Sequence, residues 1–311
     1  MGLKNKIKHL KNNSYCLTSI YLFCKVLGSK IHHLFVSDKR AIQKHYFQTF
    51  GKNIDFNNPK TINEKIAWLK LNDRRLINTL VADKYRVRDY YRKNFGEEHL
   101  IKLLFYTTKI RDINPKNITQ YPCIVKFNGG SGSWRILKDK DSVNWKELRN
   151  ACRTWKTLNH YYSTQEWQYK NIKPVFIVEE LLQDKNGHLP NDYKLHYING
   201  KLEFVYCSID REGGNYRVCY DKNWNKLPFT WVAKKDHRPD LNSANIEKPK
   251  TFKKMLEIGD VIAKNWAYVR VDFYECDGKL YYGEITLHHG SGYDTFEPEE
   301  YDLFYGNKLK L

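Results

Sequence analysis

The residues of this 311-residue chain with the strongest potential for chemistry lie in one C-terminal stretch, Tyr268 to Thr286. Two segments of alternating apolar and polar residues predict two strands, the first carrying Arg270 and Asp272 and the second carrying Glu284. Two carboxylates beside an arginine can form a structural salt bridge. Carboxylate oxygens can equally bind a hard cation such as Mg²⁺ together with phosphate groups. The residues alone leave both interpretations open.

The turn between these strands decides whether the polar side chains share one face. A two-residue turn at Asp277-Gly278 would place Glu284 on the opposite face from Asp272. A three-residue turn, Cys276–Gly278, would instead pair Arg270 with Glu284 and bring both acids to one surface. Only the three-residue turn leaves the other face fully apolar, as a buried sheet face requires. We therefore expect the three-residue turn.

A second group of residues surrounds Lys126. A predicted strand, Cys123–Phe127, carries this lysine and leads into a glycine-rich loop, Gly129–Ser133, before a second strand returns. The order is not that of a Walker A loop, in which the lysine follows the glycines. Backbone N–H groups of such a loop can still contact phosphates, with the lysine acting as a point charge. A flexible hairpin loop is the alternative interpretation.

Two further pairs of charged residues stand at strand ends. Glu179 and Glu180 close one predicted strand, Val175–Leu181, and Asp192 and Lys194 open another. Asp192 and Lys194 alternate onto one face, where a surface ion pair between them would contribute only ~0–1 kcal/mol. By themselves these residues predict no specific chemistry.

The remaining sequence predicts the elements that position these residues. Thr61 to Glu64 matches a capping box at the start of a helix, and a second helix is expected from about Leu76 to Asn94. Asn199-Gly200 indicates a tight hairpin turn. The predicted strands are 101–106, 123–127, 134–138, 175–181, 193–198, 202–209, 217–220, 269–274 and 280–286, and further helices are expected at 145–158 and 252–265. The pattern is that of an α+β protein rich in antiparallel strand pairs.

The N-terminal region is strongly basic. The chain carries a formal net charge of +18, and residues 1–49 hold nine Lys or Arg side chains against a single acid, Asp38. The apolar run 15–24 is too short to span a bilayer and is not followed by a signal-cleavage pattern. Apolar residues spaced by three and four predict one helix, which could pack on the body of the protein or lie on an anionic membrane surface. They are Leu17, Ile20, Tyr21, Cys24, Leu27 and Ile31. The seven scattered cysteines contain no C-x-x-C pair and are expected to be buried thiols of a reducing compartment.

The order of these motifs resembles the ATP-grasp superfamily, and within it the TupA-like ATP-grasp proteins of bacterial cell-surface polymer biosynthesis. The resemblance covers roughly residues 50–311. The residues that carry it are Asn58–Lys65, Asp83–Arg88, Lys126 with its glycine loop, Glu179-Glu180, Asp192–Lys194, Val269–Asp272 and Gly283–Thr286. The resemblance implies an ATP-grasp fold with two α+β subdomains gripping ATP and a basic helical extension at the N-terminus. It also implies four segments: 1–50, the extension; 51–110, a helical region; 111–178, the subdomain with the glycine-rich loop; and 179–311, the subdomain with the magnesium hairpin.

The same resemblance implies roles for single residues. Lys84 and Lys126 would contact ATP phosphates, Arg270 would stabilise charge on the transferring phosphoryl group, and Asp272 and Glu284 would bind Mg²⁺. The remaining nucleotide-binding positions would be Gly129, Gly130, Ser131, Gly132, Ser133, Glu179, Glu180, Asp192 and Lys194. Two positions depart from the family pattern. Thr286 stands where ATP-grasp enzymes commonly have a third, asparagine ligand, and Gly129 stands where relatives tend to have histidine.

The implied activity is that of an ATP-dependent carboxylate–amine ligase that forms an amide through an acyl phosphate. The carboxylate would be a uronic acid of a cell-surface polysaccharide or its precursor, and the protein would be cytoplasmic, with peripheral contact to the inner face of the membrane. One alternative is a phosphotransferase acting on a sugar. Another is a non-catalytic basic protein that binds polysaccharide or nucleic acid, although no nucleic-acid recognition motif is present.

Overall fold

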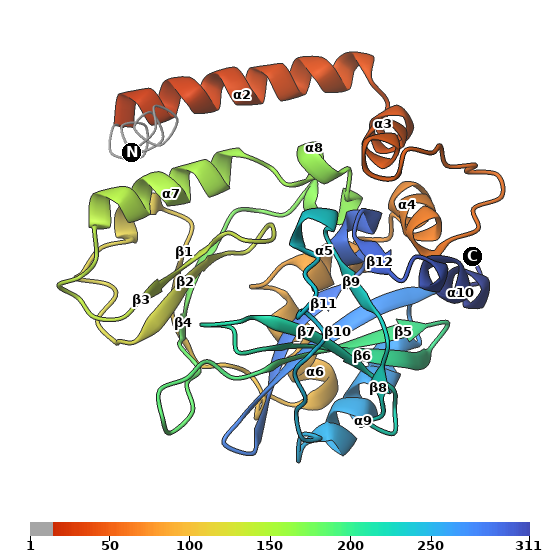
Figure 1. The fold of residues 1–311 in the computed structure, drawn as a ribbon. Coiled ribbons are helices and arrows are strands. Elements are labelled where there is room, and N and C mark those ends of the chain that lie inside the picture. The colour runs from red at the N-terminus through yellow and green to blue at the C-terminus, as the bar shows by residue number, and fades with distance from the viewer. Residues whose placement is uncertain (1–14) are drawn as a thin grey trace.

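The computed structural model describes the chain from Tyr15 to Leu311, and its α+β architecture is built from two main antiparallel sheets (Figure 1). The smaller sheet has the strand order β1-β4-β2-β3 and the larger has the order β11-β10-β5-β6-β7-β8, while β12 and β9 form a separate pair. The strands are β1 (Leu103–Thr107), β2 (Cys123–Phe127), β3 (Trp134–Leu137), β4 (Phe176–Glu180), β5 (Asp192–Ile198), β6 (Lys201–Ile209), β7 (Tyr216–Tyr220), β8 (Lys226–Leu227), β9 (Thr230–Val232), β10 (Tyr268–Cys276), β11 (Lys279–Thr286) and β12 (Thr295–Glu297).

The helices surround these sheets. They are α2 (Tyr15–Phe35), α3 (Asp38–Phe50), α4 (Ile62–Asn72), α5 (Leu76–Ala82), α6 (Val87–Phe95), α7 (Trp145–Thr157), α8 (Tyr161–Thr164), α9 (Phe252–Ala263) and α10 (Glu300–Lys308). Helix α9 and helices α5 and α6 contribute to one hydrophobic core on the large sheet, and α4 and α10 contribute to another. Helix α7 packs with the small sheet in a third core. Each sheet is therefore covered by its own helices.

Most predicted elements are confirmed, and one predicted helix is wrong. The capping box is present, with Thr61 accepting a hydrogen bond from the backbone N–H of Glu64 at 3.2 Å and the Glu64 carboxylate accepting one from Thr61 at 3.0 Å. The helix expected from Leu76 to Asn94 is broken into α5 and α6. The reason is Asp83, whose carboxylate accepts hydrogen bonds from the N–H groups of Tyr85 and Arg86 and so holds a turn between the two helices.

The hairpin at Asn199-Gly200 is also confirmed. Both residues have positive φ, 48° and 76°, as a type I′ turn requires, and Ile198 pairs with Lys201 across it. The sequence did not predict the short strands β8, β9 and β12, which have two or three residues each and too few positions to show an alternating pattern.

The register expected for the C-terminal hairpin is wrong, but Asp272 and Glu284 do lie on one face, as that register implied. The turn has two residues, Asp277-Gly278, because Cys276 pairs with Lys279. A bulge at Gly283 then shifts the register by one residue, so that Asp272 lies opposite Glu284. An extra residue in one strand thus brings both acids to one face while Leu280, Tyr282 and Ile285 of β11 remain in the apolar core.

The N-terminal helix differs from expectation on two points. It packs along α7, but the apolar face predicted to pack is largely exposed, including Ile20, Leu27 and Ile31. The side chain of Leu17 lies outside the described residues. Cys24 is exposed rather than buried, while Cys123, Cys152, Cys207, Cys219 and Cys276 are buried free thiols as predicted. No helix of the described chain is long and apolar enough to cross a membrane.

Candidate functional site

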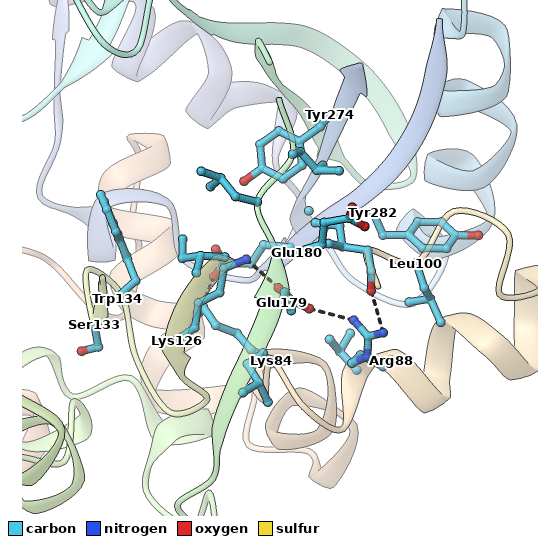
Figure 2. Close-up of a pocket in the computed structure, with 18 of the residues that line it drawn as sticks. Lys84, Arg88, Leu100, Lys126, Ser133, Trp134, Glu179, Glu180, Tyr274 and Tyr282 are labelled. Carbon is cyan, nitrogen blue, oxygen red and sulfur yellow. Dashed lines mark hydrogen bonds and ion pairs between the residues drawn. The ribbon is translucent and has the colours of Figure 1, made fainter. Parts of the chain in front are cut away.

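A cavity lies between the small sheet and the β10–β11 edge of the large sheet (Figure 2). Residues of β2 and β4 form one wall, residues of β10 and β11 the other, and the break between α5 and α6 contributes Lys84. The side chains predicted from the sequence that line this cavity are Lys84, Lys126, Ser131, Gly132, Ser133, Glu179, Glu180 and Glu284. Segments more than a hundred residues apart are therefore brought to one space. The apolar lining includes Ile177 and Leu181, so the cavity offers both charged and apolar surface.

Three charged side chains form a continuous chain across the wall contributed by the small sheet. Nζ of Lys126 donates a hydrogen bond to Oε2 of Glu179 at 2.7 Å, and Nη1 of Arg88 donates one to Oε1 of the same carboxylate at 2.7 Å (Figure 2). Arg88 also donates to the carbonyl oxygen of Ile101 at 2.8 Å. Because Glu179 is buried between two cations, it balances one of their charges and leaves a net positive charge on this group of three side chains.

The start of the glycine loop is attached to the break between α5 and α6. Asn128 is fully buried and donates from its amide group to Asp83 at 2.8 Å and to the carbonyl oxygen of Lys173 at 2.9 Å. Its backbone carbonyl accepts from the N–H of Lys84 at 3.2 Å. Nζ of Lys84 in turn donates to the carbonyl oxygen of Gly130 at 2.9 Å. These contacts fix the position of Lys84 relative to the loop, which then runs on through exposed Ser131 and Gly132.

The large sheet presents a second charged surface. Arg270 forms two hydrogen bonds of 2.7 Å with the carboxylate of Asp272, and Nζ of Lys194 donates to Asp272 at 3.2 Å. Lys194 also forms a short contact with Asp192. Burial opposes ionisation of Asp272, but the charges of Arg270 and Lys194 outweigh it and lower the pKa of this carboxyl group. Asp272 is therefore ionised at neutral pH, and the predicted salt bridge is present.

This surface carries oxygen donors of the kind that a hard cation binds, although Arg270 and Lys194 already donate to the Asp272 carboxylate and Nζ of Lys84 lies 3.7 Å from Glu284. Asp272 and Glu284 lie directly opposite each other on β10 and β11, and Thr286 follows on the same face. The Thr286 hydroxyl and one carboxylate oxygen of Asp192 are buried without a hydrogen-bond partner, so each has an unused oxygen. Mg²⁺ commonly takes one or two protein carboxylates and completes its shell with phosphates and water. Among the described residues, no group of three or more His, Cys, Asp or Glu side chains could hold a metal ion without such additional ligands.

His289 supports Arg270 from the side away from the acids. Its Nδ1 lies 2.9 Å from Nη1 of Arg270. Burial, with a further contribution from the charge of Arg270, lowers the pKa of His289 to about 3. The imidazole is therefore neutral and accepts a hydrogen bond from the guanidinium group, which fixes both groups of this pair.

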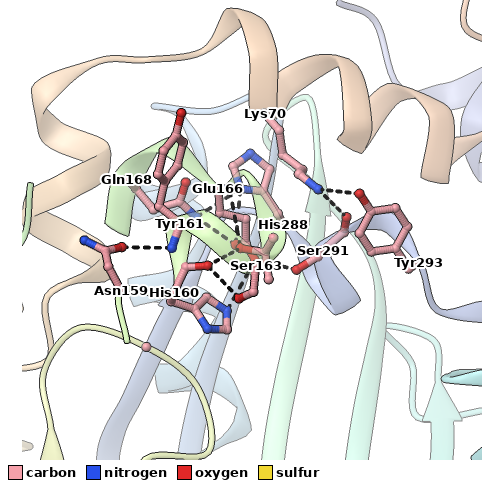
Figure 3. A network of polar contacts seen from close by, with 12 residues as sticks. Lys70, Asn159, His160, Tyr161, Ser163, Glu166, Gln168, His288, Ser291 and Tyr293 are labelled. Atoms are coloured by element: carbon pink, nitrogen blue, oxygen red, sulfur yellow. Dashed lines mark hydrogen bonds and ion pairs between the residues drawn. The ribbon is translucent and has the colours of Figure 1, made fainter. Parts of the chain in front are cut away.

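A second buried network holds the turn that carries His289 (Figure 3). Glu166 accepts a hydrogen bond from Gln168 at 2.9 Å and a short one from Ser291, and it lies 3.5 Å from His288. Nζ of Lys70 donates to the carbonyl oxygen of Ser291 at 3.0 Å. The two histidines of the His288-His289 pair thus have different partners, because His288 contacts Gln168 and His289 contacts Arg270.

The sequence did not assign a role to three residues of this site. Arg88 stands four residues after Lys84, a spacing that could have indicated a shared side of the chain. Asn128 ends the strand of Lys126, and its polar side chain directly before the glycines is a further signal. Nothing in the sequence connects His289 to Arg270, because that contact depends on how the turn after β11 folds back. Seven of the predicted site residues do not line the cavity but lie in its loop or behind its wall. They are Gly129, Gly130, Asp192, Lys194, Arg270, Asp272 and Thr286.

Comparison with known proteins identifies the family. The model of the family described as TupA-like ATPgrasp matches residues 64–310, which is most of the chain. The chain belongs to the TupA-like ATP-grasp family. This family match covers every residue of the two charged surfaces and leaves only the N-terminal region, with α2 and α3, outside it.

The TupA-like chain is also similar to solved structures of ATP-grasp enzymes. D-alanine–D-alanine ligase from Bacillus anthracis is 18% identical with a TM-score of 0.37, over 67% of this chain and 57% of that one. The corresponding ligase from Helicobacter pylori is 19% identical with a TM-score of 0.38, over 80% and 69%. The ATP-grasp ligase PsnB in complex with a precursor peptide and AMPPNP is 12% identical with a TM-score of 0.38, over 73% and 58%. This chain thus spans less than two thirds of the length of the first and third of these structures. Among curated proteins no significant match was found.

Proposed function

We propose that this protein binds MgATP in the cavity between the two sheets and is an ATP-dependent carboxylate–amine ligase. The observation that carries the proposal is the pair of opposed charged walls. One wall holds Lys126 and Arg88 on either side of Glu179, and the other presents Glu284 beside Asp272. A polyphosphate needs cations along one side and a metal held by carboxylates along the other, and this cavity has the cations and the carboxylates that such binding requires.

In this proposal the residues of the site have distinct roles in binding MgATP. Lys84 and Lys126 neutralise charge on the ATP phosphates, and the Gly129–Ser133 loop contributes backbone N–H groups above them. Asp272 and Glu284 would hold Mg²⁺, which would neutralise the phosphate charge when bound, and Thr286 has a free hydroxyl oxygen beside them. Arg270 is fixed by Asp272 and His289 and stabilises charge on the phosphoryl group in transfer.

Glu179 has a role in addition to the nucleotide binding implied by the resemblance. Besides lining the cavity with Glu180, it holds the Lys126 ammonium group in place through a direct ion pair. Asp192 acts in the same way on Lys194, which lies between Asp192 and Asp272. Both acids are thus positioning residues for cations, and Glu180 remains a direct contact to the nucleotide.

The proposed reaction has two steps. A carboxylate oxygen of the acceptor attacks the γ-phosphorus of ATP, the bond from that phosphorus to the β–γ bridging oxygen breaks, and ADP leaves from an acyl phosphate. The amine nitrogen then attacks the acyl carbon, the carbon–oxygen bond to phosphate breaks, and the amine loses a proton as the amide forms. The nucleophiles come from the substrates, so the protein needs only to position them and to neutralise charge.

The acceptor that fits best is a uronic acid of a cell-surface polysaccharide or its precursor. A net charge of +18 favours an anionic substrate, and Trp134, which is 47% exposed and lines the cavity, offers a surface on which a sugar ring can stack. The proposed location is the cytoplasm, with peripheral contact to the inner membrane surface. The four segments 1–50, 51–110, 111–178 and 179–311 remain our proposed division of the chain.

The test measures ADP and phosphate release with a panel of uronic acids and amines, for wild type, Asp272→Asn and Glu284→Gln. We expect turnover to fall by about 100-fold or more in both variants, because charge stabilisation at the transferring group is lost. Asp277→Asn is the matched control, because it makes the same change in the exposed turn of the same hairpin. Unchanged turnover in both site variants would refute the metal site. Phosphate release that needs no amine, with a phosphorylated sugar as product, would instead support the phosphotransferase alternative.

A further inference from the structure

Helix α2 has one face that packs on the protein. Leu22 is only 5% exposed, and Val26, Ser29 and His33 on the same face are partly buried. Nε2 of His33 lies 3.3 Å from the carbonyl oxygen of Tyr162, and its ring stacks on that of Tyr161 at a centroid distance of 5.6 Å. The helix runs along α7, on the side of α7 away from the two sheets (Figure 1). Packing of this face fixes which residues of α2 face outward.

The outward face of α2 is apolar. Ile20, Phe23, Leu27, Ile31 and Leu34 follow one another at spacings of three and four residues, and their exposed fractions range from 46% to 79%. We call these five residues the apolar stripe. It extends over roughly 20 Å at the 1.5 Å rise per residue of an α-helix. An exposed apolar stripe of this length marks an interaction surface, for a protein partner or for a membrane.

Exposed cations lie on α2 and on α3, the helix that follows it. Lys25 is exposed on α2, and Lys39, Arg40 and Lys44 of α3 line a shallow hollow with Phe47, itself 53% exposed. The single acid of residues 1–49, Asp38, is engaged elsewhere, because it accepts hydrogen bonds from Arg74 at 2.7 Å and from Tyr161 at 2.8 Å. The positive charge of α2 and α3 is therefore not offset by a free carboxylate of residues 1–49.

We infer that the apolar stripe docks on the surface of an anionic lipid bilayer, with α2 lying parallel to the membrane plane. An apolar face flanked by lysines and arginines is the surface that inserts at the boundary between headgroups and acyl chains. Lipid phosphates complement the cations of α3, and each lysine near an anionic surface strengthens binding by roughly fivefold. A second copy of this chain is a poorer occupant, because a symmetric contact would bring the same basic surfaces together.

This docking does not depend on the ligase reaction. The apolar stripe lies outside the family match, and none of its residues lines the nucleotide cavity. Loss of membrane binding would therefore leave turnover of a soluble substrate unchanged, and loss of ligase activity would leave membrane binding unchanged. The two proposals can fail separately.

The experiment is co-sedimentation of the full chain with vesicles of phosphatidylglycerol and phosphatidylcholine, compared with vesicles of phosphatidylcholine alone. The test variant is Leu27→Glu/Ile31→Glu. The control is Val261→Glu/Leu303→Glu, on α9 and α10. These two side chains are 47% and 48% exposed, which matches the 46% and 47% of Leu27 and Ile31. Circular dichroism checks the fold of both variants, and glutamate is a good helix former.

We expect the wild type and the control to bind the anionic vesicles, and the test variant to bind them at least about tenfold more weakly, because two carboxylates oppose insertion and meet anionic headgroups. Binding of the wild type should weaken at about 1 M salt, where the Debye length is ~3 Å and the attraction between the cations and the headgroups is screened. Equal vesicle binding of wild type and test variant would overturn the inference, and so would absence of wild-type binding. A dimer in solution that the test variant dissociates would also overturn it, since a second copy would then cover the stripe.

A measurement on the folded wild-type surface keeps the inference testable if the double variant fails to fold. An environment-sensitive fluorophore is attached to exposed Cys24, in a chain with Cys16→Ser. Its emission should shift to the blue with anionic vesicles and stay unchanged with phosphatidylcholine alone. No shift with anionic vesicles would contradict docking through this face of α2.

Discussion

The bulge at Gly283 offers a sharp test of how the two acids come together. In Gly283→Ala the added Cβ would lie 2.8 Å from the carbonyl oxygen of Asp272 and 3.0 Å from its carbonyl carbon. Both are backbone atoms, so no side chain can rotate away to make room. The strand pair must separate at the position where Asp272 faces Glu284.

This contact should lower the free energy of unfolding. Overpacking of a tightly packed position typically destabilises a protein by roughly 1–3 kcal/mol. For a chain of this size that loss corresponds to a melting temperature lower by roughly 2–6 °C. Since Gly283 has no positive φ, the effect is one of space and not of backbone conformation. We also expect the substitution to weaken ATP binding more in the presence of Mg²⁺ than in EDTA. The reason is that the displaced strand carries Glu284, a proposed Mg²⁺ ligand.

The assay combines thermal unfolding with calorimetric titration of ATP in the presence of Mg²⁺ or EDTA. Gly28→Ala is the control, because its Cβ would meet nothing within 4 Å and it lies inside α2. That control should be neutral or more stable by up to about 1 kcal/mol, since alanine has the higher helix propensity. If Gly283→Ala is as stable as the wild type and keeps the full effect of Mg²⁺, then the bulge does not set the spacing of the acids.

Three further predictions concern charged side chains of the interior and of the cavity. Lys126→Met should weaken ATP binding by about tenfold or more, measured by titration, because it removes a phosphate contact and leaves Glu179 with one cation; an unchanged affinity would place the phosphates elsewhere. Arg88→Met should lower stability by about 3 kcal/mol, measured by denaturant unfolding, since the carboxylate of Glu179 and the carbonyl oxygen of Ile101 lose their donor; a neutral effect would show that water replaces the guanidinium group. Burial lowers the pKa of Lys70 to about 8 from 10.5, so the unfolded chain binds more protons between these values. The unfolding free energy of the wild type should therefore rise relative to Lys70→Met as the pH increases from 8 to 10, and a constant difference would contradict this pKa.

The sequence determined the types and the order of the chemical groups. Alternation located the strands that carry Lys126, Glu179 and Asp272, because each is long enough to show a period of two. The capping box and the Asn199-Gly200 turn are local interactions, and local sequence was sufficient to predict them. The order of the motifs was sufficient to indicate the family, which the match over residues 64–310 confirms.

Tertiary structure alone decided how those groups meet. The bulge at Gly283 cannot be read from alternation, because a glycine fits either register and the choice depends on which residues face the core. The turn that Asp83 forms with Tyr85 and Arg86 is local, but its place in the fold is fixed by Asn128, a hydrogen-bond partner of Asp83 45 residues away. Likewise, the exposed side of α2 was set by where α7 lies, since an amphipathic pattern specifies an apolar face but not the surface that covers it. In each case the deciding contact joins segments distant in the sequence, so only the folded chain could determine it.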